Sequence, residues 1–147
     1  MSETKLESIA KVLIINEKNE ALVLTIGEYE GHPEKSFTPD LPGGRIEIAE
    51  HETEQAGALR EVEEETGIVL EQATLVLGYS GTKFYPEESK SVSRFLYTAR
   101  LDHTPEVVVS WEHADSEWVP VGDLLEKKTF RTFYKEGIEY LVSHRII

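Results

Sequence analysis

Apolar runs separated by polar turns dominate the first third of the chain. Residues 9–15 and 21–26 are rich in β-formers, and the polar residues 16–19 between them predict a hairpin turn. Residues 27–40 are polar and rich in turn formers, which is typical of a long functional or mobile loop. Further strands are expected at residues 45–48, 74–80, 91–101 and 118–121, with a loop at 81–90.

Two segments show the pattern of substantial helices. Residues 53–66 predict the first helix, and Gly67 directly after it is a typical C-terminal stop. A second helix is predicted at the C-terminus, where apolar residues recur at helical spacing: Phe130, Tyr134, Ile138, Leu141 and Val142. Asp123 and Glu126 predict a capping box for a short helix before it. Strands interleaved with helices predict a layered α/β or α+β fold.

The length and composition predict one domain that spans residues 1–147. A chain of 147 residues, 39% of them hydrophobic, can bury a sizeable core. No apolar run approaches the length of a membrane span. The sequence has no cysteine, which excludes disulfides, thiolate metal sites and a cysteine nucleophile. We therefore expect a soluble cytoplasmic protein that has no membrane partner.

The first predicted helix carries three glutamates on one side. An α-helix turns about 100° per residue, so Glu61, Glu64 and Glu65 project together. Leu59 and Val62 project from the opposite side toward a core. Like charges at this spacing destabilise a helix, and a hard cation such as Mg²⁺ or Mn²⁺ would neutralise them. The other interpretation of such a charge run is a solvated acidic face.

The formal net charge of −13 narrows the range of partners. A general nucleic-acid binder needs a basic surface, so the charge argues against nucleic acid as a partner. A polyphosphate substrate carries the same sign of charge as this protein. A divalent metal would resolve that conflict, because it supplies positive charge at the site itself.

The segment around the glutamates resembles the Nudix box, the signature of Nudix hydrolases. The family pattern is Gly, five residues, Glu, seven residues, then Arg-Glu-apolar-x-Glu-Glu-x-Gly-apolar. Residues 60–68, REVEEETGI, match the second half at every specified position, and residues 41–44, LPGG, match the usual lead-in. So many matches at fixed spacing make the resemblance specific within residues 41–68.

One departure from the family pattern lies between its two halves. Glu52 stands seven residues before Arg60, as the pattern asks, but seven residues rather than five separate it from Gly44. Glu50 has the five-residue distance from Gly44 but the wrong distance from Arg60, so the roles of Glu50 and Glu52 stay open. We interpret the departure as a two-residue insertion in the turn before the helix, which leaves the helix carboxylates in place.

The resemblance implies an α/β/α sandwich around a mixed β-sheet, in which the box forms a loop–helix–loop. It also implies roles for the box residues. Glu61, Glu64 and Glu65 would bind Mg²⁺ or Mn²⁺, and the backbone carbonyl of Gly44 is a further candidate ligand. Arg60 would orient Glu61 by a charge-assisted hydrogen bond, with a plain helix salt bridge as the alternative.

Trp111-Glu112-His113, followed by Trp118, is the second informative segment. Several Nudix subgroups that act on nucleoside triphosphates or dinucleoside polyphosphates have a similar Glu-His followed by Trp and a helix. A glutamate of this loop binds a metal or acts as general base in those subgroups, and Glu112 is the matching position. The alternative for Glu112 is an exposed loop glutamate without a catalytic role.

Four residues outside the box are candidates for substrate binding. A polyphosphate needs cationic donors, which Arg45, Lys83 and Arg94 could supply. Tyr85 could stack on a nucleobase. Surface charge is the alternative for the three cations, and ordinary packing is the alternative for Tyr85.

These features predict a metal-dependent pyrophosphohydrolase that acts on a small-molecule nucleotide. Its substrate would be a nucleoside diphosphate linked to another moiety: a nucleoside triphosphate, a dinucleoside polyphosphate or a nucleotide sugar. Water would attack a phosphorus of the P–O–P bridge. The alternative is a catalytically inactive nucleotide- or metal-sensing module, against which the intact set of glutamates argues. The choice of substrate and the formation of a homodimer stay open.

Overall fold

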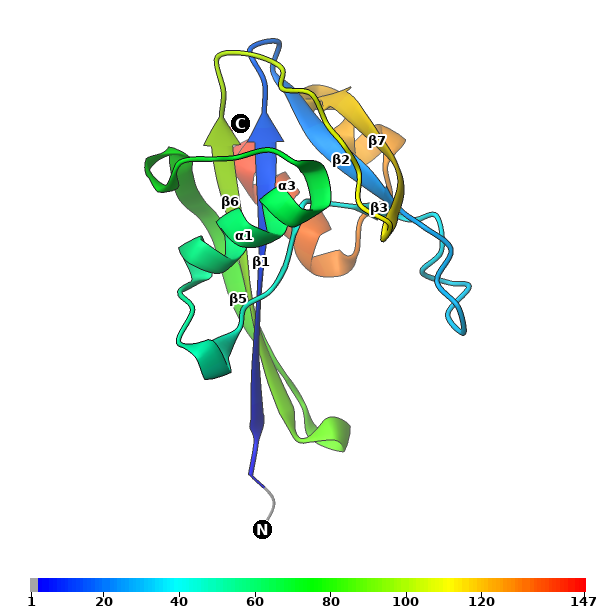
Figure 1. Ribbon diagram of the computed structural model, residues 1–147, viewed down its shortest axis with the longest axis vertical. Helices are drawn as coiled ribbons and strands as arrows, with labels where there is room; N and C mark the ends of the chain where they lie inside the picture. Colours follow the sequence, from blue (N-terminus) through cyan, green and yellow to red (C-terminus); the bar gives the residue numbers. More distant parts are fainter. Residues whose placement is uncertain (1–2) are drawn as a thin grey trace.

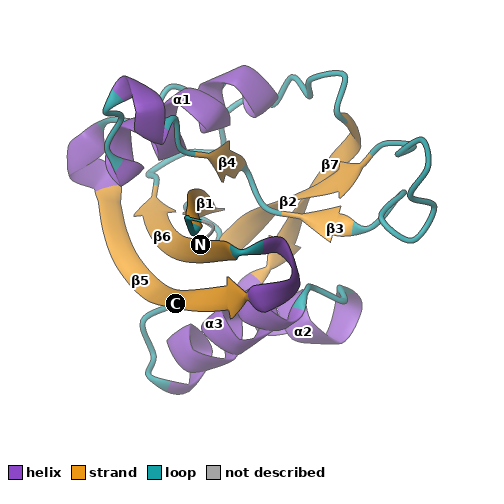
Figure 2. Ribbon diagram, turned by 90° about the horizontal axis from the view of Figure 1, so that it is seen from below, coloured by secondary structure: helices purple, strands orange, loops and turns teal. Residues whose placement is uncertain are grey.

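The computed structural model describes residues 3–147 and consists of a β-sheet with helices on both of its faces (Figure 1, Figure 2). Within these residues the sheet contains seven strands: β1 (Lys5–Ile15), β2 (Glu20–Ile26), β3 (Pro39–Asp40), β4 (Gly43–Arg45), β5 (Leu75–Tyr85), β6 (Lys90–Arg100) and β7 (His113–Pro120). The helices are α1 (Glu54–Thr66), the short α2 (Leu124–Lys127) and α3 (Thr132–Ser143). Figure 2 shows α1 on one face and α2 with α3 on the other, which confirms the expected α/β/α sandwich.

The sheet is mixed, and β1 lies at its centre. The strand order is β3-β2-β1-β6-β5, with β4 paired to β1 and β7 paired to β2. β1 and β6 run parallel over their full lengths, and the other pairings are antiparallel. β4 pairs with the middle of β1, so that Gly43 lies opposite Lys11. This pairing fixes where the glycine turn before α1 meets the sheet.

The second half of β1, from Val12 to Ile15, is a continuous apolar run because both of its faces are buried there. Leu13 and Ile15 pack into the cluster under α3, whereas Val12 and Ile14 pack into the cluster under α1. Alternate residues of a strand point to opposite faces, so each helix layer receives every second side chain. Val62 of α1 is fully buried in this way, which leaves the opposite side of α1 free for its glutamates.

Three sequence predictions of local structure are confirmed. The hairpin turn lies at residues 16–19, where Asn16 Oδ1 accepts hydrogen bonds from the N–H groups of Lys18 and Glu20. α1 begins one residue after the predicted start, because Thr53 caps it by accepting from the N–H of Ala56. Gly67 ends α1 in the left-handed conformation with φ 74°. The C-terminal helix is present as α3.

The predicted loop at 81–90 was wrong. β5 continues to Tyr85 and pairs with β6 as far as the Tyr85–Lys90 pair, so that only a short turn at Pro86–Glu88 joins them. This long hairpin extends beyond the helices together with the start of β1 (Figure 1). Ladder pairing with β6 outweighs the local turn signal of Gly81.

Three element boundaries and one helix cap also differ from the predictions. The strand expected at 45–48 lies at Gly43–Arg45, and the one expected at 118–121 begins earlier, at His113, because β2 pairs with it as far as Ile26. The polar loop after β2 ends in β3, which pairs with Leu24 and Thr25. The predicted capping box before α2 is absent, since the Asp123 side chain caps no N–H and instead pairs with Lys127 at 3.2 Å.

None of the helices in residues 3–147 has both the length and the apolar character needed to cross a membrane.

Candidate active site

Gly43 and Gly44 of β4 lie close to β1 and to a glutamate side chain of α1, respectively. Gly43 has φ 130°, and a Cβ there would clash with the carbonyl of Ala10. A Cβ on Gly44 would lie 2.8 Å from the carboxylate of Glu61. The N–H of Gly43 donates to Glu65 Oε1 at 2.8 Å in a buried hydrogen bond. The two glycines therefore bring main-chain groups into contact with two of the predicted metal-binding glutamates.

Arg60 binds three carboxylates around the same turn. Its Nε and one terminal nitrogen donate to Glu52 at 2.8 and 3.0 Å. The other terminal nitrogen donates to Glu61 at 3.0 Å and to Glu64 at 3.3 Å. Arg60 also donates to the main-chain carbonyl of Arg45 at 3.1 Å. The contact with Glu61 is the charge-assisted hydrogen bond that the family resemblance implies.

The two extra residues of the box lie in an exposed turn outside the helix. Ile48–Glu50 form a single 3₁₀ turn, and His51 closes it in the left-handed conformation with φ 60°. The carboxylate of Glu52 accepts from the N–H of Glu47 at 3.0 Å, which ties the two ends of the turn together. Glu52, and not the exposed Glu50, is the residue that holds Arg60.

Burial raises the pKa values of two of these glutamates. Glu65 is only 4% exposed, and this burial raises its pKa to about 7, against the opposing attraction of Lys11. Burial also raises the pKa of Glu61, while Arg60 opposes the shift. A cation near these carboxylates would favour their charged forms.

Lys11 connects the glycine turn to a partly buried polar network. Its ammonium lies 3.1 Å from Asp40 and donates to the carbonyl of Gly43 at 2.9 Å. His113 Nε2 lies 3.1 Å from the same Asp40 carboxylate. Burial alone would lower the pKa of Lys11, but Asp40 and Glu65 raise it above its usual value. Lys11 thus holds the residue whose N–H binds Glu65.

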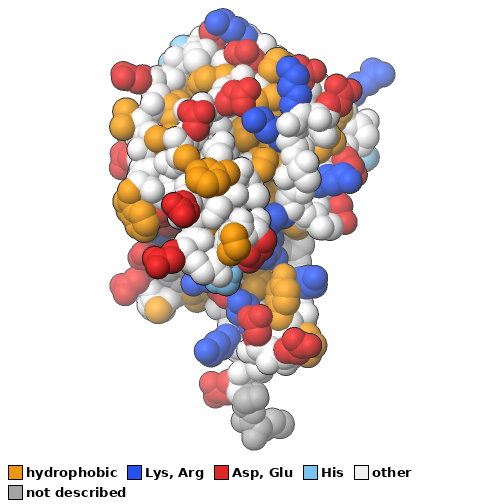
Figure 3. All heavy atoms as spheres, turned by 90° about the vertical axis from the view of Figure 1, so that its right-hand side faces the viewer, with side chains coloured by type: hydrophobic (Ala, Val, Ile, Leu, Met, Phe, Trp, Pro, Cys, Tyr) orange, Lys and Arg blue, Asp and Glu red, His pale blue; other side chains and the backbone are white. Residues whose placement is uncertain are grey.

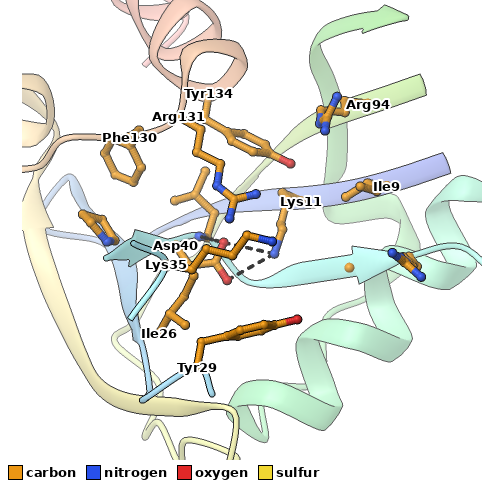
Figure 4. Close-up of a pocket in the computed structure, with 14 residues that line it drawn as sticks. Ile9, Lys11, Ile26, Tyr29, Lys35, Asp40, Arg94, Phe130, Arg131 and Tyr134 are labelled. Atoms are coloured by element: carbon orange, nitrogen blue, oxygen red, sulfur yellow. Dashed lines mark hydrogen bonds and ion pairs between the residues drawn. The ribbon is translucent and has the colours of Figure 1, made fainter. Parts of the chain in front are cut away.

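Two adjoining cavities open beside these residues. The first measures about 480 Å³ and is lined by Gly44, Glu61, Glu65 and Glu112 among others. The second measures about 270 Å³ and shares Lys11, Tyr29, Asp40, Gly44 and Arg45 with the first. Its further cations are Lys35, Arg94 and Arg131. Figure 4 shows Lys11 of β1, Lys35 of the loop before β3 and Arg131, which precedes α3, pointing toward Asp40.

The structure brings together only part of the predicted set. Glu64 does not line the glutamate cavity, and its side chain is 58% exposed beside Arg60. Lys83 and Tyr85 line neither cavity but a groove between β5 and α3, where the Lys83 ammonium lies 5.1 Å from the Tyr85 ring centre. The groove adjoins the second cavity, with which it shares Arg131 and Tyr134. Arg94 lies between that groove and the second cavity. Arg45 lines both adjoining cavities and pairs with Glu7 at 2.9 Å.

Sequence reasoning missed several residues of the two cavities. Lys11 interrupts the apolar run 9–15, and a charge inside a buried strand was the available signal. Asp40, Tyr29 and Lys35 lie in the segment that was interpreted only as a polar loop. Arg131 directly precedes α3, and no pattern in the sequence links it to the box.

The oxygen donors of the site fit a hard divalent cation, although their side chains do not converge on one point. The site offers carboxylate and carbonyl oxygens, which suit Mg²⁺ or Mn²⁺. Within residues 3–147, no three acidic or histidine side chains already surround one point as metal ligands would. Glu64 pairs with Arg60 at 3.3 Å and does not line the cavity that contains Glu61 and Glu65.

Comparison with known proteins identifies the family to which this chain belongs. The model of the NUDIX domain matches residues 5–141, which is nearly the whole chain. The chain belongs to the Nudix family. It is an enzyme of that family, a Nudix hydrolase, and the box residues described above lie inside the matched region.

Two curated relatives of this Nudix chain are named bis(5′-nucleosyl)-tetraphosphatase [asymmetrical]. The protein from Mus musculus is 30% identical over 111 residues, which cover 73% of each chain. The protein from Caenorhabditis elegans is 30% identical over 95 residues, which cover 65% of this chain and 66% of that protein. Matches of this extent support the family, while the substrate of this chain is a separate question.

A solved structure with the same fold covers the chain almost completely. The crystal structure of a MutT protein from Methanosarcina mazei Go1 superimposes with a TM-score of 0.79, at 25% sequence identity. The match covers 99% of this chain and 99% of that one. The mixed sheet and its two helical layers are therefore those of the Nudix fold.

Proposed function

We propose that this Nudix hydrolase cleaves the P–O–P bridge of a nucleoside diphosphate linked to another moiety, with dinucleoside tetraphosphates as the first candidates. The observation that carries the proposal is the pair of adjoining cavities. One contains Glu61, Glu65 and Glu112, and the other contains Lys35 and Arg131. A carboxylate site beside a cationic site suits a long polyphosphate, and the names of the two curated relatives point to the same substrate class.

Glu61, Glu64 and Glu65, with the carbonyl of Gly44, would hold Mg²⁺ or Mn²⁺. The bound cation would neutralise the phosphates and lower the pKa of the attacking water. Gly43 fixes the Glu65 carboxylate through its N–H, and Lys11 in turn fixes Gly43. These contacts keep one ligand in place before any substrate arrives, which reduces the entropy lost on binding.

Arg60 and Glu112 would serve the reaction in different ways. Arg60 orients Glu61 through the 3.0 Å hydrogen bond and, through Glu52, anchors the turn before the helix. Glu112 reaches the same cavity from the loop before β7, where its carboxylate can take the proton from the attacking water or bind the metal.

The cations of the second cavity would bind the phosphates that are not attacked. Lys35 and Arg131 offer N–H donors to phosphate oxygens, and Arg94 extends the cationic lining toward the groove beside β5. In a protein of net charge −13, this concentration of cations identifies the part of the surface that suits a polyanion.

The alternative is a Nudix module that binds a nucleotide without cleaving it. The contact between Arg60 and Glu64 favours it, because Arg60 holds one of the expected metal ligands away from the cavity. The hydrolase and the binding module differ in substrate turnover and not in affinity for the nucleotide.

The discriminating experiment is a substrate panel with Mg²⁺, analysed by chromatography of the products. The panel contains nucleoside triphosphates, ADP-ribose, nucleotide sugars and dinucleoside tetraphosphates. Release of a nucleoside monophosphate from at least one compound, abolished by a chelator, is the expected result. Binding of a panel member by calorimetry without any product would favour the sensing module.

A further inference from the structure

Trp111 is the most exposed large apolar side chain in the described part of the chain. Its side chain is 91% exposed, yet it lines the cavity that contains Glu61, Glu65 and Glu112. Figure 3 views the side of the molecule that carries β3 and β7, and shows hydrophobic side chains standing among acidic ones. A large ring held in water at the wall of a substrate cavity is available for contact with a ligand.

Tyr29 brings a second aromatic ring to the same cavity from another loop. It is 48% exposed and lines both adjoining cavities. The N–H of Gly27 donates to the carbonyl of Glu112 at 3.0 Å, which ties the loop of Tyr29 to the loop of Trp111. A Cβ on Gly27 would lie 3.3 Å from that carbonyl, so glycine permits the close approach. The two rings therefore belong to loops whose backbones are fixed to one another.

The loop of Tyr29 also contributes a hydrogen-bond acceptor to the cavity. Glu28 directly precedes Tyr29 and lines the same cavity. A carboxylate accepts hydrogen bonds from the amino groups of a nucleobase. The cations of the cavity, Lys11 and Arg45, come instead from β1 and β4. An aromatic ring and an acceptor for base amino groups thus adjoin one another on this loop.

We propose that Trp111 and Tyr29 form the nucleobase subsite, with Trp111 as the main stacking surface. Nucleobases present flat π-faces, which stack on aromatic side chains with little dependence on sequence. The inference deepens the proposed function, since it assigns specificity for a base-bearing substrate to two named side chains. It also replaces Tyr85 as the expected stacking residue, because Tyr85 lies in the groove beside β5 and not in this cavity.

Tryptophan fluorescence tests the subsite without any turnover. The chain has two tryptophans, so Trp118→Phe leaves Trp111 as the single emitter. Trp118 is partly buried against the core cluster under α1 and does not line the cavity. Titration with AMP should quench Trp111 in a saturable manner, whereas ribose 5-phosphate, which lacks the base, should not. Equal quenching by both compounds, or no quenching by AMP, would overturn the proposal.

Steady-state kinetics with diadenosine tetraphosphate provides the second readout. Trp111→Ala should raise KM about tenfold and change kcat little, because stacking contributes binding energy away from the reacting phosphorus. Trp111→Phe should restore most of the affinity, and Trp118→Phe is the matched control.

A wild-type KM for Trp111→Ala would overturn the proposal. A sedimentation coefficient of the Trp111→Ala variant that differs from the wild-type value would also overturn it, because it would identify Trp111 as a subunit contact. Quenching by AMP in a protein that turns over no substrate would contradict the proposed function and leave the base subsite standing.

Discussion

At the scale of single residues, Glu61 is the carboxylate on which most contacts of the site converge. It accepts a hydrogen bond from Arg60 and lies beside Gly44, where a Cβ would come within 2.8 Å of its carboxylate. Burial raises its pKa, and Glu64 and Glu112 raise it further. We predict that Glu61→Gln lowers turnover with Mg²⁺ by about 10²–10⁴-fold while the fold is kept. Glu63→Gln is the control, because Glu63 is an exposed neighbour on the same helix. Comparable losses in both variants would contradict the assignment.

Asp40 is a residue whose substitution should reduce the stability of the fold. Asp40→Asn leaves the Lys11 ammonium without its main partner, which should reduce the free energy of unfolding by about 3 kcal/mol. Despite the opposing effect of burial, Lys11 and His113 lower the pKa of Asp40, so this stabilisation is present above pH ~4 and is lost as the pH falls further. Urea unfolding of both proteins at neutral and acidic pH measures the difference. A change within about 0.5 kcal/mol at neutral pH would contradict this role.

At the scale of elements, the turn between β4 and α1 should tolerate shortening. The register of α1 is fixed by contacts outside the exposed part of the turn, from Gly43 to Glu65 and from Glu52 to Arg60. Deleting Ala49 and Glu50 restores the family spacing and removes only exposed residues. We predict cooperative thermal unfolding and measurable activity in the deletion variant. Loss of the folded state would show that the turn itself sets the register.

Elements with strong local signals were predictable, and those defined by pairing were not. Thr53 and Gly67 mark the two ends of α1 in the sequence, because capping is a local interaction. The extent of β5 was missed, since it depends on β6 and not on the residues of β5 itself. The same division holds at the site. Box spacing identified the glutamates, whereas Lys11 and Asp40 are 29 positions apart and meet only through the sheet.

At the scale of the whole molecule, binding of Mg²⁺ should stabilise the fold. A ligand that binds only the folded state raises Tm by mass action. It also relieves the repulsion between the carboxylates of α1. We predict that Tm rises with Mg²⁺ concentration in the wild-type protein and that the rise is smaller in Glu65→Gln, while Glu63→Gln behaves like the wild type. Equal shifts in all three proteins would mean that Mg²⁺ binds elsewhere.

Cytoplasmic location, homodimer formation and the lack of nucleic-acid partners stay predictions.

Hydrolysis of diadenosine tetraphosphate with Mg²⁺, followed by separation of the products, shows whether this Nudix protein cleaves a polyphosphate at the site built around Glu61. We expect equal amounts of AMP and ATP from the wild-type protein, because one water that breaks the first P–O–P bridge leaves one phosphate on one adenosine and three on the other. A chelator and Glu61→Gln should each remove nearly all of this activity. Folded wild-type protein that releases no nucleotide, or a Glu61→Gln variant that cleaves at the wild-type rate, would contradict the proposed function.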